Sequence, residues 1–136
     1  MLRGDVMAIR VGARSNLQDG VIVHVTSGQF TTTIGDDCTI GHGAIIHGCT
    51  IEDQCLIGMG STILDGARVG RGSLVGAGAL VTPGTDIPPG SLVLGAPARV
   101  VRPIKPKERE QIAYGAAHYV DLARRYLAED TGSSVR

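Results

Sequence analysis

A six-residue period of aliphatic side chains restricts the fold of this sequence more than any other feature. From Ile51 onwards an aliphatic residue returns at every sixth position as far as Val93. The members of this unbroken run are Ile51, Ile57, Ile63, Val69, Val75, Val81, Ile87 and Val93. A period of six fits neither an α-helix nor a plain alternating strand, and it predicts short strands joined by tight turns.

The same period runs through the first half of the chain, on both sides of an irregular segment, Val25–Thr33. It is carried before this segment by Val11, Leu17 and Val23, and after it by Ile34, Ile40 and Ile46. One short step of five residues then joins Ile46 to Ile51. If the irregular segment replaces a single corner, the register continues across it.

Three six-residue units would close one triangular coil of 18 residues, and successive coils would stack roughly 4.8 Å apart by parallel pairing. The aliphatic residues point into the resulting prism, and the position two residues before each of them is small, as at Cys38, Ala44, Cys55, Ser61, Ala67, Ser73 and Ala79. Glycine follows the aliphatic residue at Gly12, Gly35, Gly41, Gly58, Gly70 and Gly76, where a corner needs positive φ or close approach. This pattern resembles the hexapeptide-repeat left-handed parallel β-helix, an all-β fold. Its handedness is implied by the resemblance.

The repeat is expected to end near Val100–Pro103, and an amphipathic α-helix is predicted to follow. Apolar residues recur there at helical spacing, at Ile112, Ala116, Tyr119, Val120, Ala123 and Leu127. Glu108 and Glu110 suit the positive end of the helix dipole. We therefore expect a β-helix domain over residues 1–103, a C-terminal helix over 104–129 and a disordered tail over 130–136.

Composition excludes several classes of partner. The 136 residues carry no formal net charge, and no basic run is present, which argues against binding to nucleic acid. The apolar stretches are far shorter than 18 residues, so we expect no membrane partner. Three cysteines without paired spacing argue against a secreted disulfide framework and for a reducing, cytoplasmic location.

The register also brings histidines together. His24 follows Val23 and His47 follows Ile46, so the two imidazoles should stack on one face, one coil apart, and could share a metal ion. His42 falls on a different face and could reach that ion only from a neighbouring molecule. Ordinary solvated or buried histidines are the alternative interpretation, and His118 on the predicted helix is given no role.

Three blocks make the resemblance more specific: LRGD at 2–5, GARSNLQDGVIVH at 12–24 and IGHGAIIHGC at 40–49. In this order they resemble the γ-class carbonic anhydrase family across nearly the whole chain. The resemblance implies a homotrimer with metal sites between subunits. The implied ligands are His24 and His47 from one chain and His42 from the next.

The same resemblance implies roles for four further residues. Arg3 and Asp5 would take part in ion pairs between subunits and support the binding of substrate or product. Gln18 would hydrogen-bond the metal-bound water, and Asp19 would pair with the arginine across the interface. Zn²⁺ is the expected cofactor, with Fe²⁺ or Co²⁺ as alternatives, and its bound hydroxide would hydrate CO₂ reversibly to bicarbonate.

Two departures from the family keep other functions open. The family has one or more coils before the LRGD block, so the start is either truncated or lacks an upper coil. The irregular segment has no Asp or Glu, whereas active members move protons through an acidic loop there. One alternative is a hexapeptide acyltransferase or acyl-CoA thioesterase, suggested by GAPAR at 95–99. The other is a non-catalytic metal-binding scaffold or assembly subunit.

Overall fold

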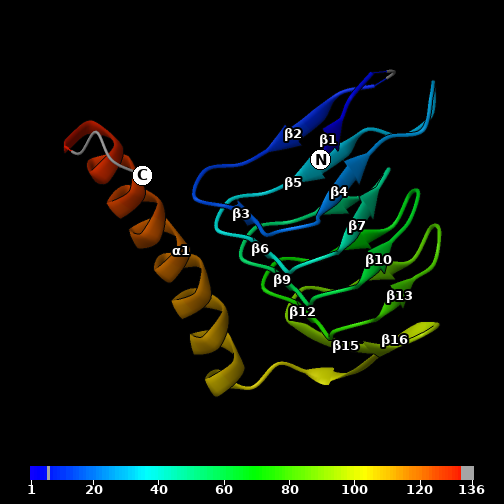
Figure 1. Cartoon of the computed structure of the whole chain (residues 1–136). Helices are drawn as coiled ribbons and strands as arrows, with labels where there is room; N and C mark the ends of the chain where they lie inside the picture. The colour runs from blue at the N-terminus through cyan, green and yellow to red at the C-terminus, as the bar shows by residue number, and fades with distance from the viewer. Residues whose placement is uncertain (6, 133–136) are drawn as a thin grey trace.

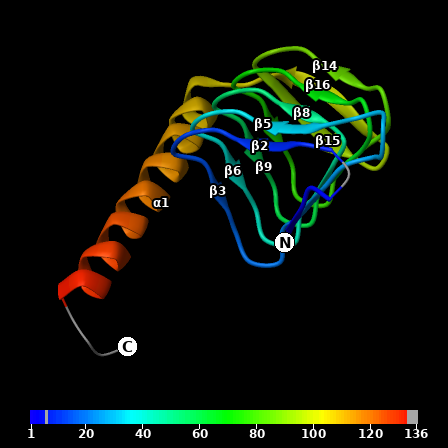
Figure 2. The same cartoon turned by 90° about the horizontal axis from the view of Figure 1, so that it is seen from above.

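The protein is a triangular prism of short parallel strands with one long helix beside it (Figures 1 and 2). The computed structural model describes residues 1–5 and 7–132, with side chains as far as residue 128. Each face of the prism is a sheet, and successive strands of one sheet come from successive coils. This is the left-handed parallel β-helix expected from the six-residue period.

The three sheets are defined by their strands. The first contains β1 (Leu2–Arg3), β4 (Ile22–His24), β7 (Ile45–His47), β10 (Thr62–Ile63) and β13 (Leu80–Val81). The second contains β2 (Ile9–Val11), β5 (Thr32–Ile34), β8 (Thr50–Ile51), β11 (Arg68–Val69) and β14 (Asp86–Ile87). The third contains β3 (Asn16–Leu17), β6 (Thr39–Ile40), β9 (Leu56–Ile57), β12 (Leu74–Val75), β15 (Ser91–Gly95) and β16 (Ala98–Pro103).

The core is the column of aliphatic residues that the period predicts. Ile40, Ile46 and Ile57 have no exposed surface, and burying such a side chain fully stabilises the fold by about 1.5–3 kcal/mol. Cys38 and Cys55 fill the small inward positions and are equally buried. The interior is therefore closed by residue types that stack at coil spacing without needing aromatic side chains.

The glycines that follow the aliphatic residues are required for close approach, because they lie outside the positive-φ set. A Cβ on Gly35, for example, would lie 2.8 Å from the backbone nitrogen of Asp53 in the next coil. Positive φ occurs two residues further along many corners, as at Gly43 and Gly60. The sequence had left both reasons open.

The irregular segment does replace one corner. Between β4 and β5 the chain makes a small excursion in which Thr26 and Phe30 form an antiparallel bridge. Phe30 lies over the next corners, 3.1 Å from where a Cβ of Gly48 would stand. The register is preserved, because Val23 pairs with Ile46.

The last strand differs from the expectation of parallel coils. β16 folds back on β15 as an antiparallel hairpin after the cis bond between Ala96 and Pro97. The helix α1 (Pro106–Gly132) follows. Arg102 and Glu108 hold its start by a two-pronged ion pair, with nitrogen–oxygen distances of 2.7 and 2.8 Å.

The predicted apolar stripe of α1 is buried only in its first half. Ile112 and Ala116 are buried against the prism, whereas Leu127 is 66% exposed and Ala123 is exposed. The helix also extends through residues 130–132, which had been assigned to the tail, while residues 133–136 lie outside the described residues. Among the helices described, none has the length and apolarity needed to cross a membrane.

Candidate metal centre

The first sheet brings two of the predicted metal ligands together. His24 at the end of β4 pairs in register with His47 at the end of β7, and Arg3 of β1 pairs with His24 on its other side. Their outward direction follows from the alternation of a strand, since Val23 and Ile46 beside them point into the core. The stacking of His24 on His47 that the register predicted is therefore confirmed.

A chain of hydrogen bonds runs through this column. Nδ1 of His24 lies 3.1 Å from Nε2 of His47, and Nε2 of His24 lies 2.9 Å from a guanidinium nitrogen of Arg3. At the other end, Nδ1 of His47 lies 2.6 Å from Oδ1 of Asp65. Asp5 completes the group, with carboxylate oxygens 3.7 Å from Arg3 and 3.4 Å from His24.

The donors and acceptors of this chain can be assigned from chemistry. A carboxylate only accepts, so His47 donates from Nδ1 to Asp65 and presents a lone pair at Nε2. An arginine only donates, so Nε2 of His24 accepts from Arg3, and Nδ1 of His24 donates to His47. The Arg3 contact is shorter than the contact of Asp5 with the same nitrogen, which favours this neutral form of His24.

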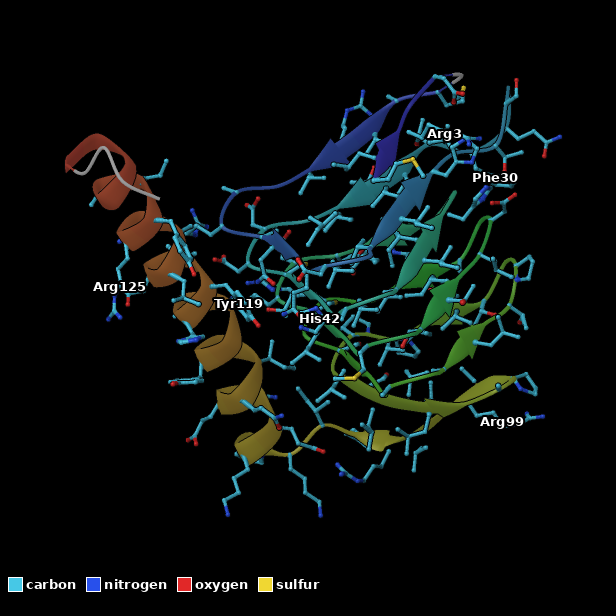
Figure 3. The ribbon with its side chains drawn as sticks, in the orientation of Figure 1. Arg3, Phe30, His42, Arg99, Tyr119 and Arg125 are labelled. Atoms are coloured by element: carbon cyan, nitrogen blue, oxygen red, sulfur yellow. The ribbon has the colours of Figure 1, made fainter. Side chains whose placement is uncertain are left out.

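The other three predicted residues lie at the opposite edge of the same sheet. Gln18 and Asp19 follow β3, and His42 follows β6, at the corner where the chain turns from the third sheet into the first. The amide of Gly43 donates to the carbonyl of Asp19, which places His42 directly beside Asp19 in the neighbouring coil. Figure 3 shows His42 and Arg3 at opposite ends of the strands that carry the histidine pair.

Within one chain this second group makes few side-chain contacts. Gln18 donates from Nε2 to the side-chain oxygen of Asn16 at 3.3 Å, and His42 and Asp19 are exposed. His42 is five residues before His47, up to about 16 Å of extended chain. The structure thus divides the seven predicted site residues between two edges of one face.

The histidine pair suits a metal ion. Two imidazole nitrogens bound to Zn²⁺ at about 2.05 Å and at a tetrahedral angle would be roughly 3.3 Å apart. The facing nitrogens of His24 and His47 are 3.1 Å apart. To bind an ion there, His24 would carry its proton on Nε2, 3.4 Å from Asp5, and not on Nδ1. The hydrogen bond from Nδ1 of His47 to Asp65 is the usual outer support of a metal-binding histidine. In the described part of one chain, no three His, Cys, Asp or Glu side chains gather closely enough to hold an ion.

A groove of about 630 Å³ lies elsewhere, between α1 and the corner of the prism that carries Arg14 and Asp37. Its helix side is formed by small and apolar residues such as Ala113 and Ala116. None of the seven predicted site residues lines it. The histidine pair instead stands on an open face of the prism.

Comparison with known proteins shows the family of the chain. A family model described as "Bacterial transferase hexapeptide (six repeats)" matches residues 31–63 and 48–83. A protein named "Probable carbonic anhydrase" from Methanocaldococcus jannaschii is 52% identical over 90% of the chain and 77% of its own length. The chain belongs to the γ-class carbonic anhydrase-like family.

Two further relatives of this family show how far the match extends. "Gamma carbonic anhydrase 1, mitochondrial" of Arabidopsis thaliana is 44% identical over 96% of the chain, and the chain spans about half (49%) of the length of that relative. A crystal structure of a hexapeptide transferase family protein from Anaplasma phagocytophilum has a TM-score of 0.87 and 39% identity, and covers 92% of this chain and 73% of its own.

Asp65 and Thr26 are functional candidates that the sequence did not identify. Thr26 Oγ1 donates to Oδ2 of Asp65 at 2.5 Å, while Oδ1 accepts from His47. The six-residue period alone does not pair Asp65 with His47, because the short step after Ile46 makes this coil one residue shorter and places Asp65 opposite Gly48.

Proposed function

We propose that the protein is a metal-dependent γ-class carbonic anhydrase-like hydro-lyase whose sites lie between the subunits of a homotrimer. The observation that supports this most directly is the division of the seven residues. Arg3, Asp5, His24 and His47 lie at one edge of the first sheet, and Gln18, Asp19 and His42 lie at the other. The family membership of the chain supports the same reaction class.

Two different edges of one face can meet only when copies associate head to tail. A head-to-tail contact that closes on itself forms a ring, and the resemblance to the family implies a ring of three copies. His42 of one copy would then complete the pair formed by His24 and His47 of the next. The exposed side chains of Ile22 and Ile45 on this sheet would be covered in such a ring.

The chain's own residues have distinct tasks in this proposal. His24, His47 and His42 of a neighbour would hold Zn²⁺, Fe²⁺ or Co²⁺, which lowers the pKa of a water molecule so that a nucleophile exists near neutral pH. Gln18 has an amide on the edge that faces the site and would orient that water and CO₂. Arg3, in an ion pair with Asp5 in the single chain, would offer planar donors to bicarbonate.

The overall reaction converts CO₂ and water into bicarbonate and one proton. Asp19, beside His42, would pair with Arg3 of the neighbouring copy and so hold the two edges together. The cytoplasmic location, which the three cysteines without paired spacing suggest, stays a prediction.

Mixing two inactive variants tests the shared site. His42→Ala and His47→Ala should each lose metal, because each removes one donor from every site. After joint unfolding and refolding of an equimolar mixture, about one quarter of the sites should regain both intact edges, because two neighbouring copies must be of the required types. Metal content and the CO₂ hydration rate should both return to about one quarter of their wild-type values. No recovery in a mixture that reassembles would contradict a site shared between copies.

A transferase is the second candidate, because the matching family model is described as a transferase. The turn from Gly95 to Ala98 at the tip of the β15–β16 hairpin carries the motif that suggested coenzyme A. Titration with coenzyme A separates the candidates, since the carbonic anhydrase proposal expects no binding at millimolar concentration. A non-catalytic scaffold would bind metal and leave the CO₂ hydration rate at the uncatalysed value.

A further inference from the structure

Asp65 connects the predicted metal ligands to the loop that interrupts the repeat. Oδ1 lies 2.6 Å from Nδ1 of His47, and Oδ2 accepts from the hydroxyl of Thr26 at 2.5 Å. The carboxylate comes from the coil below the histidine, and the threonine belongs to the loop at residues 25–31. Each carboxylate oxygen therefore has a partner, and the partners lie on two separate parts of the chain.

The direction of the hydrogen bonds gives this carboxylate a specific effect. Asp65 accepts a hydrogen bond from Nδ1 of His47, so the proton of a neutral His47 stays on Nδ1. The lone pair of Nε2 then faces His24. Nε2 of His47 can bind an ion only in that tautomer. Without Asp65 the ring could exchange tautomers and rotate, since among the described residues its other hydrogen bond is with His24.

We propose that Asp65 is a positioning residue that fixes the tautomer and orientation of His47 for metal binding, and that Thr26 positions Asp65. The proposal rests on the proposed function and adds to it two residues outside the predicted site. A carboxylate that orients a metal-binding histidine typically accounts for 10–100-fold in metal affinity.

The surroundings of Asp65 distinguish positioning from other roles. Each oxygen already accepts a hydrogen bond within the chain, and Oδ1 is directed at Nδ1 of His47. An ionised carboxylate only accepts hydrogen bonds, so the donors of Thr26 and His47 together hold Asp65 in this position.

The neighbouring corner is shaped to admit the carboxylate. Gly48 lies opposite Asp65 in the coil above, as the hydrogen bond from the amide of Gly66 to the carbonyl of Gly48 shows. A Cβ on Gly48 would lie 3.0 Å from Cγ of Asp65 and closer still to Oδ1. Phe30 covers the same two corners, 3.1 Å from that Cβ position and 3.2 Å from the equivalent position on Gly66.

Two measurements on the full chain test the proposal. The first is the affinity for Co²⁺ or Zn²⁺, measured by competition with a chelator, for Asp65→Ala, Asp65→Asn and Thr26→Val. We expect Asp65→Ala to weaken binding roughly 10–100-fold. Asp65→Asn should lose less, because its amide oxygen can still accept, and Thr26→Val should lose several-fold. The double variant Thr26→Val/Asp65→Ala should match Asp65→Ala, because Thr26 acts through Asp65.

The second measurement is the nitrogen-15 spectrum of the His47 ring in metal-free protein. The wild type should show the tautomer with the proton on Nδ1, and Asp65→Ala should show a mixture or the other tautomer. A structural role alone would leave this signal unchanged in a folded variant. Asp86→Ala removes an exposed carboxylate from β14 and serves as the matched control for charge.

The outcomes separate this inference from the proposed function. If the wild type binds metal and Asp65→Ala binds it equally well, the positioning role is wrong. If the wild type binds no metal, the proposed function is wrong, and the ring spectrum still decides whether Asp65 orients His47. An unchanged tautomer in folded Asp65→Ala contradicts the inference in either case.

Discussion

Gly48→Ala is the substitution that most directly perturbs the contact between Asp65 and His47 without altering either residue. Gly48 has a φ of +62°, and an alanine in this left-handed region costs roughly 1–2 kcal/mol. The added Cβ would stand 3.0 Å from Cγ of Asp65 and 3.1 Å from Cβ of Phe30. The carboxylate must therefore move away from the histidine.

Gly84→Ala provides the matched control. Gly84 lies in the same column of corners with a φ of +72°, and a Cβ there would meet nothing within 4 Å. Both variants should lose about 1 kcal/mol of stability through the backbone, which lowers Tm by roughly 3–5 °C in a chain of this size. Only Gly48→Ala should also lose metal affinity, by about 10-fold or more, because only there is Asp65 displaced.

The assay is chelator competition for Co²⁺ or Zn²⁺ on both variants and the wild type, with thermal unfolding recorded at one protein concentration. Equal metal affinity in Gly48→Ala and Gly84→Ala would refute the reasoning, provided that the wild type binds metal. A loss of affinity in Gly84→Ala as large as in Gly48→Ala would also refute it, because backbone strain would then be sufficient.

Three further predictions concern stability and reactivity. Burial raises the pKa of the Cys49 thiol to about 12, so thiol reagents at pH 8 should label it only after unfolding, with native and denatured labelling compared. The pKa of Glu108 is lowered to about 2 by Arg102 and the backbone amide of Lys105. The stability that this pair contributes is complete above the ordinary glutamate pKa of about 4.3 and is lost as pH falls towards 2, so urea unfolding of wild type and Glu108→Gln should converge over that interval. Gly70→Ala should cost about 3 kcal/mol in urea unfolding or prevent folding, because its Cβ would lie 2.6 Å from a backbone oxygen of the next coil.

The period was sufficient to predict the prism because in this fold one local rule decides most long-range contacts. Once Val23 is known to stack on Ile46, the pairing of His24 with His47 follows without further information. The fold-back of β16 could not be predicted in this way, since nothing in the six-residue spacing records the direction of a strand. The same limit applies to α1, where helical spacing predicted an apolar stripe but could not show that Leu127 lies beyond the edge of the prism.

The candidate site shows why register alone was not sufficient for side chains. The register correctly placed side chains that project from equivalent positions in successive coils. Contacts between a corner and a strand depend instead on the exact number of residues in a coil. Asp65 follows His47 by 18 residues, and an ideal coil would stack the two directly. The short step after Ile46 makes that coil one residue shorter, so Asp65 lies opposite Gly48 instead.

That displacement by one residue has a chemical consequence. In the next coil the position opposite His47 is Leu64, directly after β10, and its side chain offers no acceptor for the imidazole. At the corner, by contrast, Gly48 leaves room for the carboxylate to reach Nδ1, and the loop is near enough for Thr26 to hold the other oxygen. The two irregularities of the repeat, the inserted loop and the short step, therefore meet at one histidine. In an uninterrupted prism Asp65 would stack directly on His47, but no loop would supply the hydroxyl of Thr26 to its second oxygen.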